Sequence, residues 1–249
     1  MSDRPEDRRP DRVPLSTDRV VSAAVVVVDT DGEAAFTMRR VGAALDVQAM
    51  SIYRYFTSRR TLLDAVAETV ARRTAADLSD QLAPGDGWRQ YLNKLAHVLR
   101  RLTSTHPRLF LLIATHPAAA PWLRPPMRTA QWLNAFVRRL VDDRFSPAAA
   151  VAAYRQFSAF LLGYLLPEAA AHDSDLTRTK VSSGAALPVQ PPETEPSPEA
   201  TGPEAAGFEV AGFPRLTAVA ALLGADSYTS DFRRGLTHVL DQLARLRRQ

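Results

Sequence analysis

The sequence of 249 residues predicts an all-α fold. Hydrophobic residues recur at spacings of three and four along most of the chain, which is the period of an amphipathic helix. No segment shows the alternation of apolar and polar residues that is typical of a half-buried strand. Clusters of Asp, Gly, Ser and Pro divide the pattern into pieces of helical length, and we find no internal repeat.

The composition narrows the class of protein. Cysteine is absent, which excludes disulfides, thiol catalysis and zinc sites built on thiolates. The apolar runs are shorter than the roughly 20 residues that span a bilayer, and the N-terminus lacks the apolar core of a signal peptide. We therefore expect a cytoplasmic protein with no membrane partner.

The charge hints at an anionic partner without identifying it. The net charge is +4 and the pI about 9.7. Among the 31 basic residues only Lys94 and Lys180 are lysine. Arginine forms paired hydrogen bonds with carboxylates, phosphates and guanine edges, but the codon usage of a GC-rich genome produces the same bias.

The N-terminal region predicts an arm and then a helix. Residues 1–14 mix Asp, Glu, Arg and Pro with little apolar content, which predicts disorder. Ser16 or Thr17 can cap the helix that follows. The valine run 25–28 favours a strand by propensity, but it follows this cap and precedes the stop signal at 29–32. We therefore predict one helix through the run.

From residue 37 to residue 82 the helical pattern is interrupted twice. The spacing predicts a short helix over 37–45, a tight turn at Asp46 and Val47, and a second short helix over 48–56. A third, longer helix is expected to begin after a cap at Thr57 or Ser58. Residues 15–60 are therefore expected to form one small domain, and residues 61–249 a second.

The second domain is expected to be helical with one long interruption. Helices are predicted over 88–105, 108–115, 127–142 and 148–166, and the last is preceded by Ser146 and Pro147, a strong start signal. The Pro- and Glu-rich composition predicts a flexible loop over 168–213, with helices over 214–223 and 230–248. Its segment 182–204 is either a lid or a disordered insertion.

The two short helices and their turn have the layout of a helix-turn-helix, whose second helix enters the major groove of DNA. From Ala34 to Arg60 the chain carries five arginines against one acid, Asp46, a local net charge of +4. Thr37, at a helix start, can offer hydroxyl and amide donors to a phosphate. The pattern alone also fits three packed helices with no DNA-binding role, whose arginines simply face the solvent.

The segment from Phe36 to Val66, FTMRRVGAALDVQAMSIYRYFTSRRTLLDAV, resembles the DNA-binding domain of the TetR family of bacterial transcriptional regulators. The shared positions are apolar residues, a Tyr-x-Tyr-Phe run and the stretch after it: Val41, Leu45, Val47, Ile52, Tyr53, Tyr55, Phe56, Ser58, Arg59, Leu62 and Leu63. Asp46 stands where the family usually has glycine. Aspartate tolerates the left-handed backbone that this turn favours.

The resemblance implies a homodimer that binds double-stranded DNA at a palindromic operator. Phosphate contacts are then expected at Thr37, Tyr53, Tyr55 and Arg59. Base or groove contacts are expected at Arg39, Gln48, Ala49, Met50, Ser51 and Arg54. For Tyr53 the competing role is packing on the first helix, and for Met50 it is plain solvent exposure.

Trp88 at a helix start, the apolar helix over 148–166, the long polar loop after it and the Phe-Arg-Arg-Gly-Leu run at 232–236 are similar to the ligand-binding and dimerisation domain of that family, especially its tetracycline-repressor branch. The resemblance implies that the helices at 148–166 and 230–248 pair between subunits. The resemblance implies a pocket for a small apolar effector. Its expected lining is Leu95, Leu99, Phe110, Ile113, His116, Trp132, Phe136, Phe157 and Leu161. Thr74, Ala75 and Ile113 stand where the tetracycline branch has histidines, so tetracycline is not the expected effector.

The function implied is that of a ligand-responsive repressor with no cofactor and no metal. His97, His106 and His116 lack the spacing of metal ligands. An enzyme on a helical scaffold is a second hypothesis, against which stands the absence of a phosphate loop, a His-x-x-x-His pair and a nucleophile elbow. A third is an adaptor that binds a protein through the basic corner.

Overall fold

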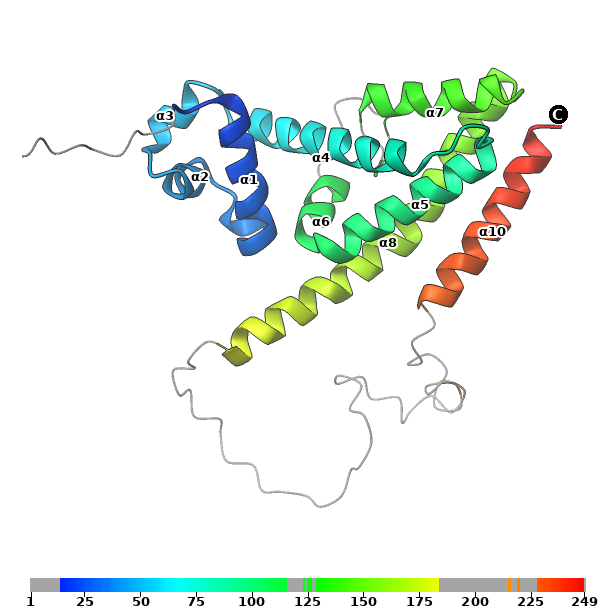
Figure 1. Cartoon of the computed structure of the whole chain (residues 1–249). Helices are drawn as coiled ribbons and strands as arrows, with labels where there is room; N and C mark the ends of the chain where they lie inside the picture. Colours follow the sequence, from blue (N-terminus) through cyan, green and yellow to red (C-terminus); the bar gives the residue numbers. More distant parts are fainter. Residues whose placement is uncertain are drawn as a thin grey trace, which may run out of the picture.

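The computed structural model describes residues 14–115, 123, 125–126, 129–183, 215, 219 and 228–248. Within them the chain is helical and contains no strand, which confirms the all-α prediction. The helices in chain order are α1 (Thr17–Asp31), α2 (Met38–Ala44), α3 (Ala49–Tyr53), α4 (Arg59–Gln81), α5 (Trp88–Thr105), α6 (Pro107–Thr115), α7 (Ala130–Asp142), α8 (Pro147–Ser183) and α10 (Tyr228–Leu246). Figure 1 shows them from blue α1 to red α10.

Helix α1 begins and ends at the signals in the sequence. The Ser16 hydroxyl oxygen accepts a hydrogen bond from the Arg19 amide at 3.3 Å, which caps the first turn. Gly32 ends the helix with a φ of 82°, a left-handed conformation that costs glycine little. The valine run between them is helical, as predicted, and Val27 and Val28 are buried in the core.

Two hydrophobic cores lie along the molecule, and α4 contributes to both. The first joins α1, α2, α3 and the start of α4, and α6 adds Leu109 and Leu112 to it. The second joins α5, α7, α8 and α10. Helix α4 contributes Leu63 to the first core and Leu78 to the second, so one helix connects the two ends of the molecule (Figure 1).

The prediction of a loop over 168–213 is wrong for its first part, because α8 continues through Pro167 to Ser183. Proline removes one backbone hydrogen bond from a helix. Contacts from other helices hold the following turns: Arg100 Nε lies 2.8 and 3.0 Å from the two carboxylate oxygens of Glu168, and Arg108 pairs with Asp173. These charge-assisted bonds offset the lost backbone bond. Residues 184–213, and with them most of 182–204, lie outside the described residues.

Helix α8 is apolar because it is the central helix of the second core. Over Pro147–Ser174 it is the one described helix that is long and apolar enough to cross a membrane. It packs against α5, α6, α7 and α10, and Phe157 and Leu161 have no exposed surface. Its composition is that of a helix surrounded by protein.

The remaining helix boundaries differ from expectation by a few residues. Helix α3 ends at Tyr53 rather than at Phe56, because the chain turns there and Phe56 enters the first core. Helix α7 begins after a Thr129 cap. Of the helix predicted over 214–223, the structure describes Arg215 and Val219, both helical. The predicted arm lies outside the described residues apart from Pro14.

Candidate nucleic-acid interface and effector cavity

The corner between α2 and α3 is set by two close backbone segments. A Cβ at Gly42 would lie 2.8 Å from the Val47 carbonyl oxygen, so only glycine fits. The Val47 amide donates to the Gly42 carbonyl oxygen at 2.9 Å. Asp46 has a φ of 54°, which is the left-handed turn expected at this position. The angle between the two short helices is therefore fixed by the backbone itself.

The start of α2 exposes a donor and a cation. The Thr37 hydroxyl oxygen caps α2 by accepting from the Arg40 amide at 3.1 Å. A hydroxyl that accepts keeps its own proton, so Thr37 can still donate to a phosphate. Thr37 and Arg39 are exposed, whereas Met38 and Val41 are buried.

Helix α3 is anchored by one buried side chain, Ile52, which has no exposed surface. The residues expected to meet DNA surround this anchor: Gln48, Met50, Tyr53 and Arg54 are exposed, and Ala49 and Ser51 are half-buried. Met50 is 72% exposed and Tyr53 44% exposed, so neither belongs to the core. Helix α3 is therefore anchored on its buried side and presents polar, apolar and cationic side chains on its exposed side. Side chains of these kinds are the ones that contact base edges and phosphates in a DNA groove.

Two of the expected phosphate contacts are already engaged within the chain. The Tyr55 hydroxyl donates to the Leu15 carbonyl oxygen at 2.6 Å. Arg59 donates from Nε to the Phe36 carbonyl oxygen at 2.8 Å, and its guanidinium lies 5.2 Å from the centre of the Phe36 ring. Both side chains tie separate segments of the small domain together, a role that sequence reasoning missed because the partners are 40 and 23 residues away.

The free cations of the corner are fewer than the sequence count. Arg40 pairs with Asp31 at 2.7 Å, and Arg59 lies 3.5 Å from Glu33. Asp31 and Glu33 lie just before the segment 34–60, which contains five arginines and one acid. When these two acids are included, the corner has five arginines and three acids, so its net charge falls from +4 to +2. Among the described residues, Arg39, Arg54 and Arg60 form no hydrogen bond or ion pair through their side chains. These three are the cations available to an anion.

The second domain contains two cavities where the effector pocket is expected. A small one of about 30 Å³ is lined by four of the expected residues, Leu99, Phe110, Ile113 and Trp132. A larger one of about 290 Å³ is lined by Leu95 and again by Trp132. The Trp132 indole N–H donates to the Ala71 carbonyl oxygen at 3.0 Å, which holds the ring between the two cavities.

The other expected pocket residues have different places. Phe136, Phe157 and Leu161 have no exposed surface and line neither of these two cavities. The rings of Phe136 and Phe157 lie 6.0 Å apart in the second core. His116 lies outside the described residues. The expected lining left out Val70 and Ala71 of α4, although the apolar spacing of this helix was their signal, and Thr74 beside them was noted only as a position where the tetracycline branch has histidine.

Two of the histidines singled out in the sequence, His97 and His106, have partners within the chain. The His106 Nδ1 lies 2.7 Å from the Asp29 carboxylate, and the His97 ring packs edge-on against Phe232. Burial, followed by the nearby Arg100, holds the pKa of His97 below its ordinary value. Within the part of the chain that the structure describes, no group of three or more His, Asp or Glu residues is placed to hold a metal.

Comparisons with known proteins agree with this geometry. The family model described as bacterial regulatory proteins of the tetR family matches residues 20–66. The HTH-type transcriptional repressor DrrR1 of Streptomyces coeruleorubidus is 39% identical over 119 residues, which are 46% of this chain and 42% of that protein. The tetracycline repressor protein class A from transposon 1721 of Escherichia coli is 31% identical over 162 residues, 65% of this chain and 70% of that one.

The similarity in fold extends through both domains. The structure of a point variant of TetR from Acinetobacter baumannii AYE in complex with minocycline matches with a TM-score of 0.59 and 21% identity, over 94% of this chain and 99% of that one. The chain spans less than half the length of the first two curated relatives, 42% and 48%.

Proposed function

The chain belongs to the TetR family of bacterial regulatory proteins, and on this premise we propose that it is a ligand-responsive transcriptional repressor. It binds a palindromic operator as a homodimer and leaves the operator when a small apolar effector binds. The proposal includes no catalytic step and no cofactor, and it places the protein in the cytoplasm.

The observation that carries the proposal is the exposed front of α3. Ile52 holds the helix from behind, and Gln48, Met50, Tyr53 and Arg54 remain accessible. The unpaired Arg39, Arg54 and Arg60 supply the positive charge that releases counterions from DNA. Two relatives whose names include the word repressor support the sign of regulation.

Dimerisation is proposed through α8 and α10. These helices pack closely, because a Cβ at Gly235 in α10 would lie 2.9 Å from the Phe160 ring of α8. Beyond this contact α8 keeps apolar side chains at its surface: Val151 is 41% exposed, and Leu162 and Leu166 are only partly buried. Two-fold pairing presents two α3 helices to half-sites about one helical turn apart.

The effector is proposed to bind the cavities on either side of Trp132. Most of the lining is apolar, although the larger cavity also has Ser79, Tyr91 and Arg138 in its wall. The Trp132 ring is held between the two by its indole hydrogen bond to the Ala71 carbonyl oxygen. Rotation of this ring would join the two spaces into one of the size that small molecules fill. Tetracycline is not the proposed effector, because Thr74, Ala75 and Ile113 offer no imidazole.

Helix α4 is the proposed connection between effector and operator. Its first turns carry Leu62 and Leu63 of the small domain, and its later turns carry Val70 and Thr74 of the cavity wall. An effector that fits only one tilt of this helix shifts the distance between the two recognition helices of the dimer. Ligand and operator then oppose each other through one shared equilibrium.

The test is selection of duplex DNA from a random pool, followed by fluorescence anisotropy at two salt concentrations. The repressor predicts a palindromic winner and an affinity that falls steeply with salt. The double variant Tyr53→Ala, Arg54→Ala should lose about a hundredfold in affinity while its melting temperature is unchanged. An adaptor that binds protein through the same corner predicts no enriched sequence and no effect of the double variant on DNA binding.

A further inference from the structure

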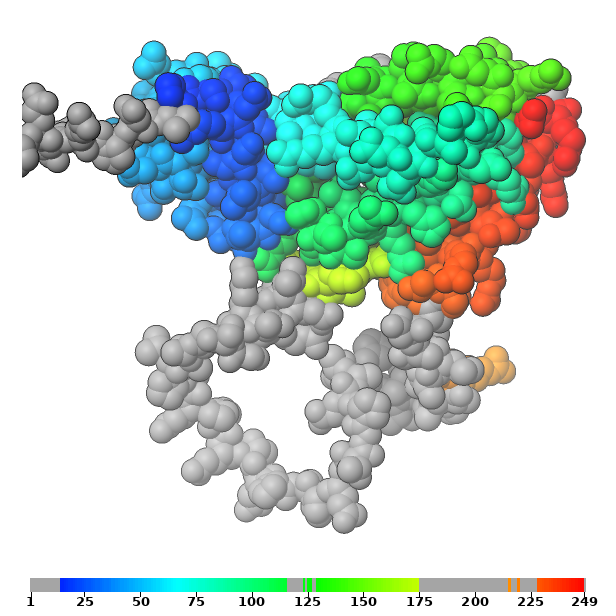
Figure 2. Space-filling view, in the orientation of Figure 1, coloured from blue at the N-terminus to red at the C-terminus, as the bar shows by residue number. Residues whose placement is uncertain are grey.

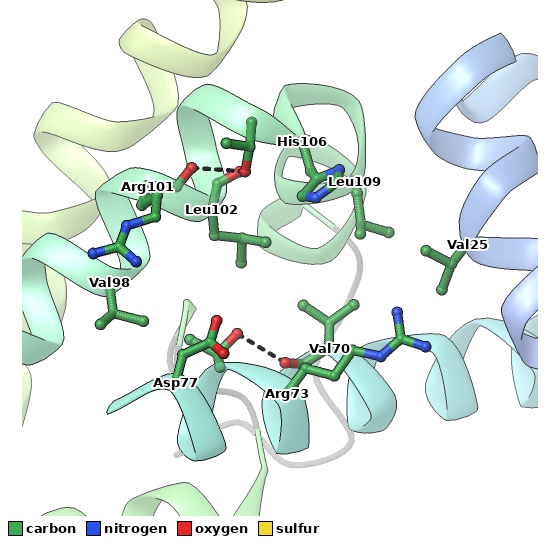
Figure 3. Close-up of a pocket in the computed structure, with 11 residues that line it drawn as sticks. Val25, Val70, Arg73, Asp77, Val98, Arg101, Leu102, His106 and Leu109 are labelled. Atoms are coloured by element: carbon green, nitrogen blue, oxygen red, sulfur yellow. Dashed lines mark hydrogen bonds between the residues drawn. The ribbon is translucent and has the colours of Figure 1, made fainter. Parts of the chain in front are cut away.

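A third hollow lies at the junction of the small domain and the second domain, on the other side of Val70, Thr74 and Leu102 from the smaller cavity at Trp132, whose lining shares these three residues. It has a volume of about 180 Å³ and lies between α1, α4, α5 and α6. Figure 3 shows its lining side chains arranged around it, with Val25 on the side of α1, His106 at the junction of α5 and α6, and the other labelled residues on α4, α5 and α6. Figure 2 shows the blue small domain in direct contact with the cyan and green helices of the second.

The floor and the rim of this hollow differ in chemistry. Val70, Val98 and Leu109 are buried and supply an aliphatic floor. Arg73, Arg101 and Asp77 are exposed and supply the rim. A site with this division suits an amphipathic ligand, with its apolar part inside and its charge at the mouth.

The charged residues of the rim favour a negatively charged ligand. Among the described residues, the guanidinium groups of Arg73 and Arg101 form no hydrogen bond or ion pair, and Asp77 has no salt-bridge partner within 4.0 Å. Two positive groups and one negative group leave one net positive charge. Arginine in this state is ready to form paired hydrogen bonds with a carboxylate.

The volume limits the size of the ligand. A dry apolar cavity of about 150 Å³ holds one benzene ring. The hollow of about 180 Å³ therefore accommodates one ring or a short alkyl chain, with the carboxylate outside the apolar floor. We propose that it binds a small apolar monocarboxylate, and that occupancy changes the affinity of the protein for its operator.

The coupling half of this inference rests on the proposed function and on the contacts beside the hollow. The lining residue His106 lies with Nδ1 2.7 Å from the Asp29 carboxylate at the end of α1. Two residues further on, Arg108 donates from Nη1 to the Thr30 carbonyl oxygen at 2.6 Å. An occupant wedged between Val25 and α5 acts on the same helices that position α1, so it biases the orientation of the DNA-binding domain.

Binding is tested first, without DNA, by isothermal titration calorimetry of the full chain. The probe is 3-phenylpropionate, and its neutral counterpart is 3-phenylpropionamide. The inference predicts that the acid binds at least about tenfold more tightly than the amide. Arg73→Gln and Arg101→Gln should each lower the affinity for the acid to nearly that for the amide.

The matched control is Arg72→Gln, which removes the same charge one residue away from a side chain that does not line the hollow and that donates to Thr69. It should leave the affinity for the acid unchanged. Circular dichroism and melting curves establish that all three variants are folded. Equal affinity for acid and amide would overturn the inference. So would no heat of binding up to roughly 10 mM, or acid binding that the Arg73 and Arg101 variants leave intact, which would place the ligand in the cavities at Trp132.

The coupling is then measured by repeating the titration with saturating operator. The affinity for the acid must change by the same factor by which the acid changes the affinity for operator. An unchanged affinity would refute the coupling and leave the binding site standing. If no operator can be selected, the proposed function fails, while the calorimetric result on the free chain is unaffected.

Discussion

Arginine has opposite roles at the two ends of this molecule. In the corner between α2 and α3, where we propose that DNA binds, Arg39 and Arg54 are exposed and unpaired within the described chain. In the second domain Arg100 and Arg108 are mostly covered and are hydrogen-bonded to carboxylates of α8. The same residue type leaves free cations at the surface in one region and holds a helix in place like a clamp in the other, and a count of charges along the sequence does not separate the two roles.

The largest expected effect comes from removing the clamp. Arg100→Ala leaves the Glu168 carboxylate, 8% exposed, without its partner. We expect a loss of about 3 kcal/mol in the free energy of unfolding, because an unpaired buried charge is costly. Urea unfolding measures it, and operator affinity per folded molecule should be unchanged.

A matched variant shows whether burial is the reason. Arg89→Ala breaks the exposed Arg89–Asp241 pair, which joins α5 to α10 as the Arg100–Glu168 pair joins α5 to α8, and should cost less than about 1 kcal/mol. Restoration of stability by Arg100→Leu with Glu168→Leu would support the account. Equal costs for the two alanine variants would contradict the distinction between clamp and surface pair.

Substitution of Arg54 should change DNA affinity and leave stability unchanged, the reverse of the effect expected at Arg100. Arg54→Ala is expected to weaken operator binding about tenfold to a hundredfold and to leave the free energy of unfolding unchanged, because its side chain has no partner within the described chain. Anisotropy titrations measure the affinity. Arg40→Ala serves as the control, because Arg40 is already paired with Asp31 and should change binding by less than about threefold.

Arg59 combines features of both regions. It lies in the corner between α2 and α3, but its side chain is hydrogen-bonded within the chain, as those of Arg100 and Arg108 are. Arg59→Ala removes the hydrogen bond to the Phe36 carbonyl oxygen and should cost about 1 to 2 kcal/mol of stability. The slope of log affinity against log salt should stay the same. If Arg59 contacts a phosphate instead, the slope of the variant becomes less negative by about 0.9. Salt titrations of the variant will detect this change.

The smallest expected effect is a pH dependence in the second domain. The pKa of His97 is lowered in the folded chain, chiefly by burial, so on acidification the unfolded chain takes up this proton first. The contribution of His97 to stability is therefore present above its unfolded pKa and is lost as pH falls below about 6.5. Melting temperatures at pH 7 and pH 5 should differ less in His97→Gln than in the parent protein. An equal difference would show that the proton is taken up alike in both states.

Local signals in the sequence predict local structure well. The N-cap of α1 is Ser16, one of the two residues expected, that of α4 is Ser58, again one of two, and Thr37 caps α2 at the expected helix start. Asp46 has the left-handed backbone that the family resemblance implied. Each depends on residues only a few positions apart. The exposed front of α3 follows in the same way, because one buried side chain at Ile52 determines which neighbours point outward.

Long-range contacts account for what the sequence could not predict. The extension of α8 past Pro167 depends on Arg100 and Arg108, which lie 68 and 65 positions away from their partners. The engagement of Tyr55 with Leu15 has the same origin. Cavities are harder still, because their walls come from three or four helices and a buried apolar residue has the same pattern whether it lines a cavity or fills a core.

The central claim is that two copies of α3 read successive major grooves. Methylation interference at guanine N7 on the selected operator tests it most directly, because N7 lies in the major groove. The account predicts interference at two symmetric clusters about one helical turn apart, each weakened by Tyr53→Ala with Arg54→Ala. Interference at a single cluster, or none above background, would contradict it.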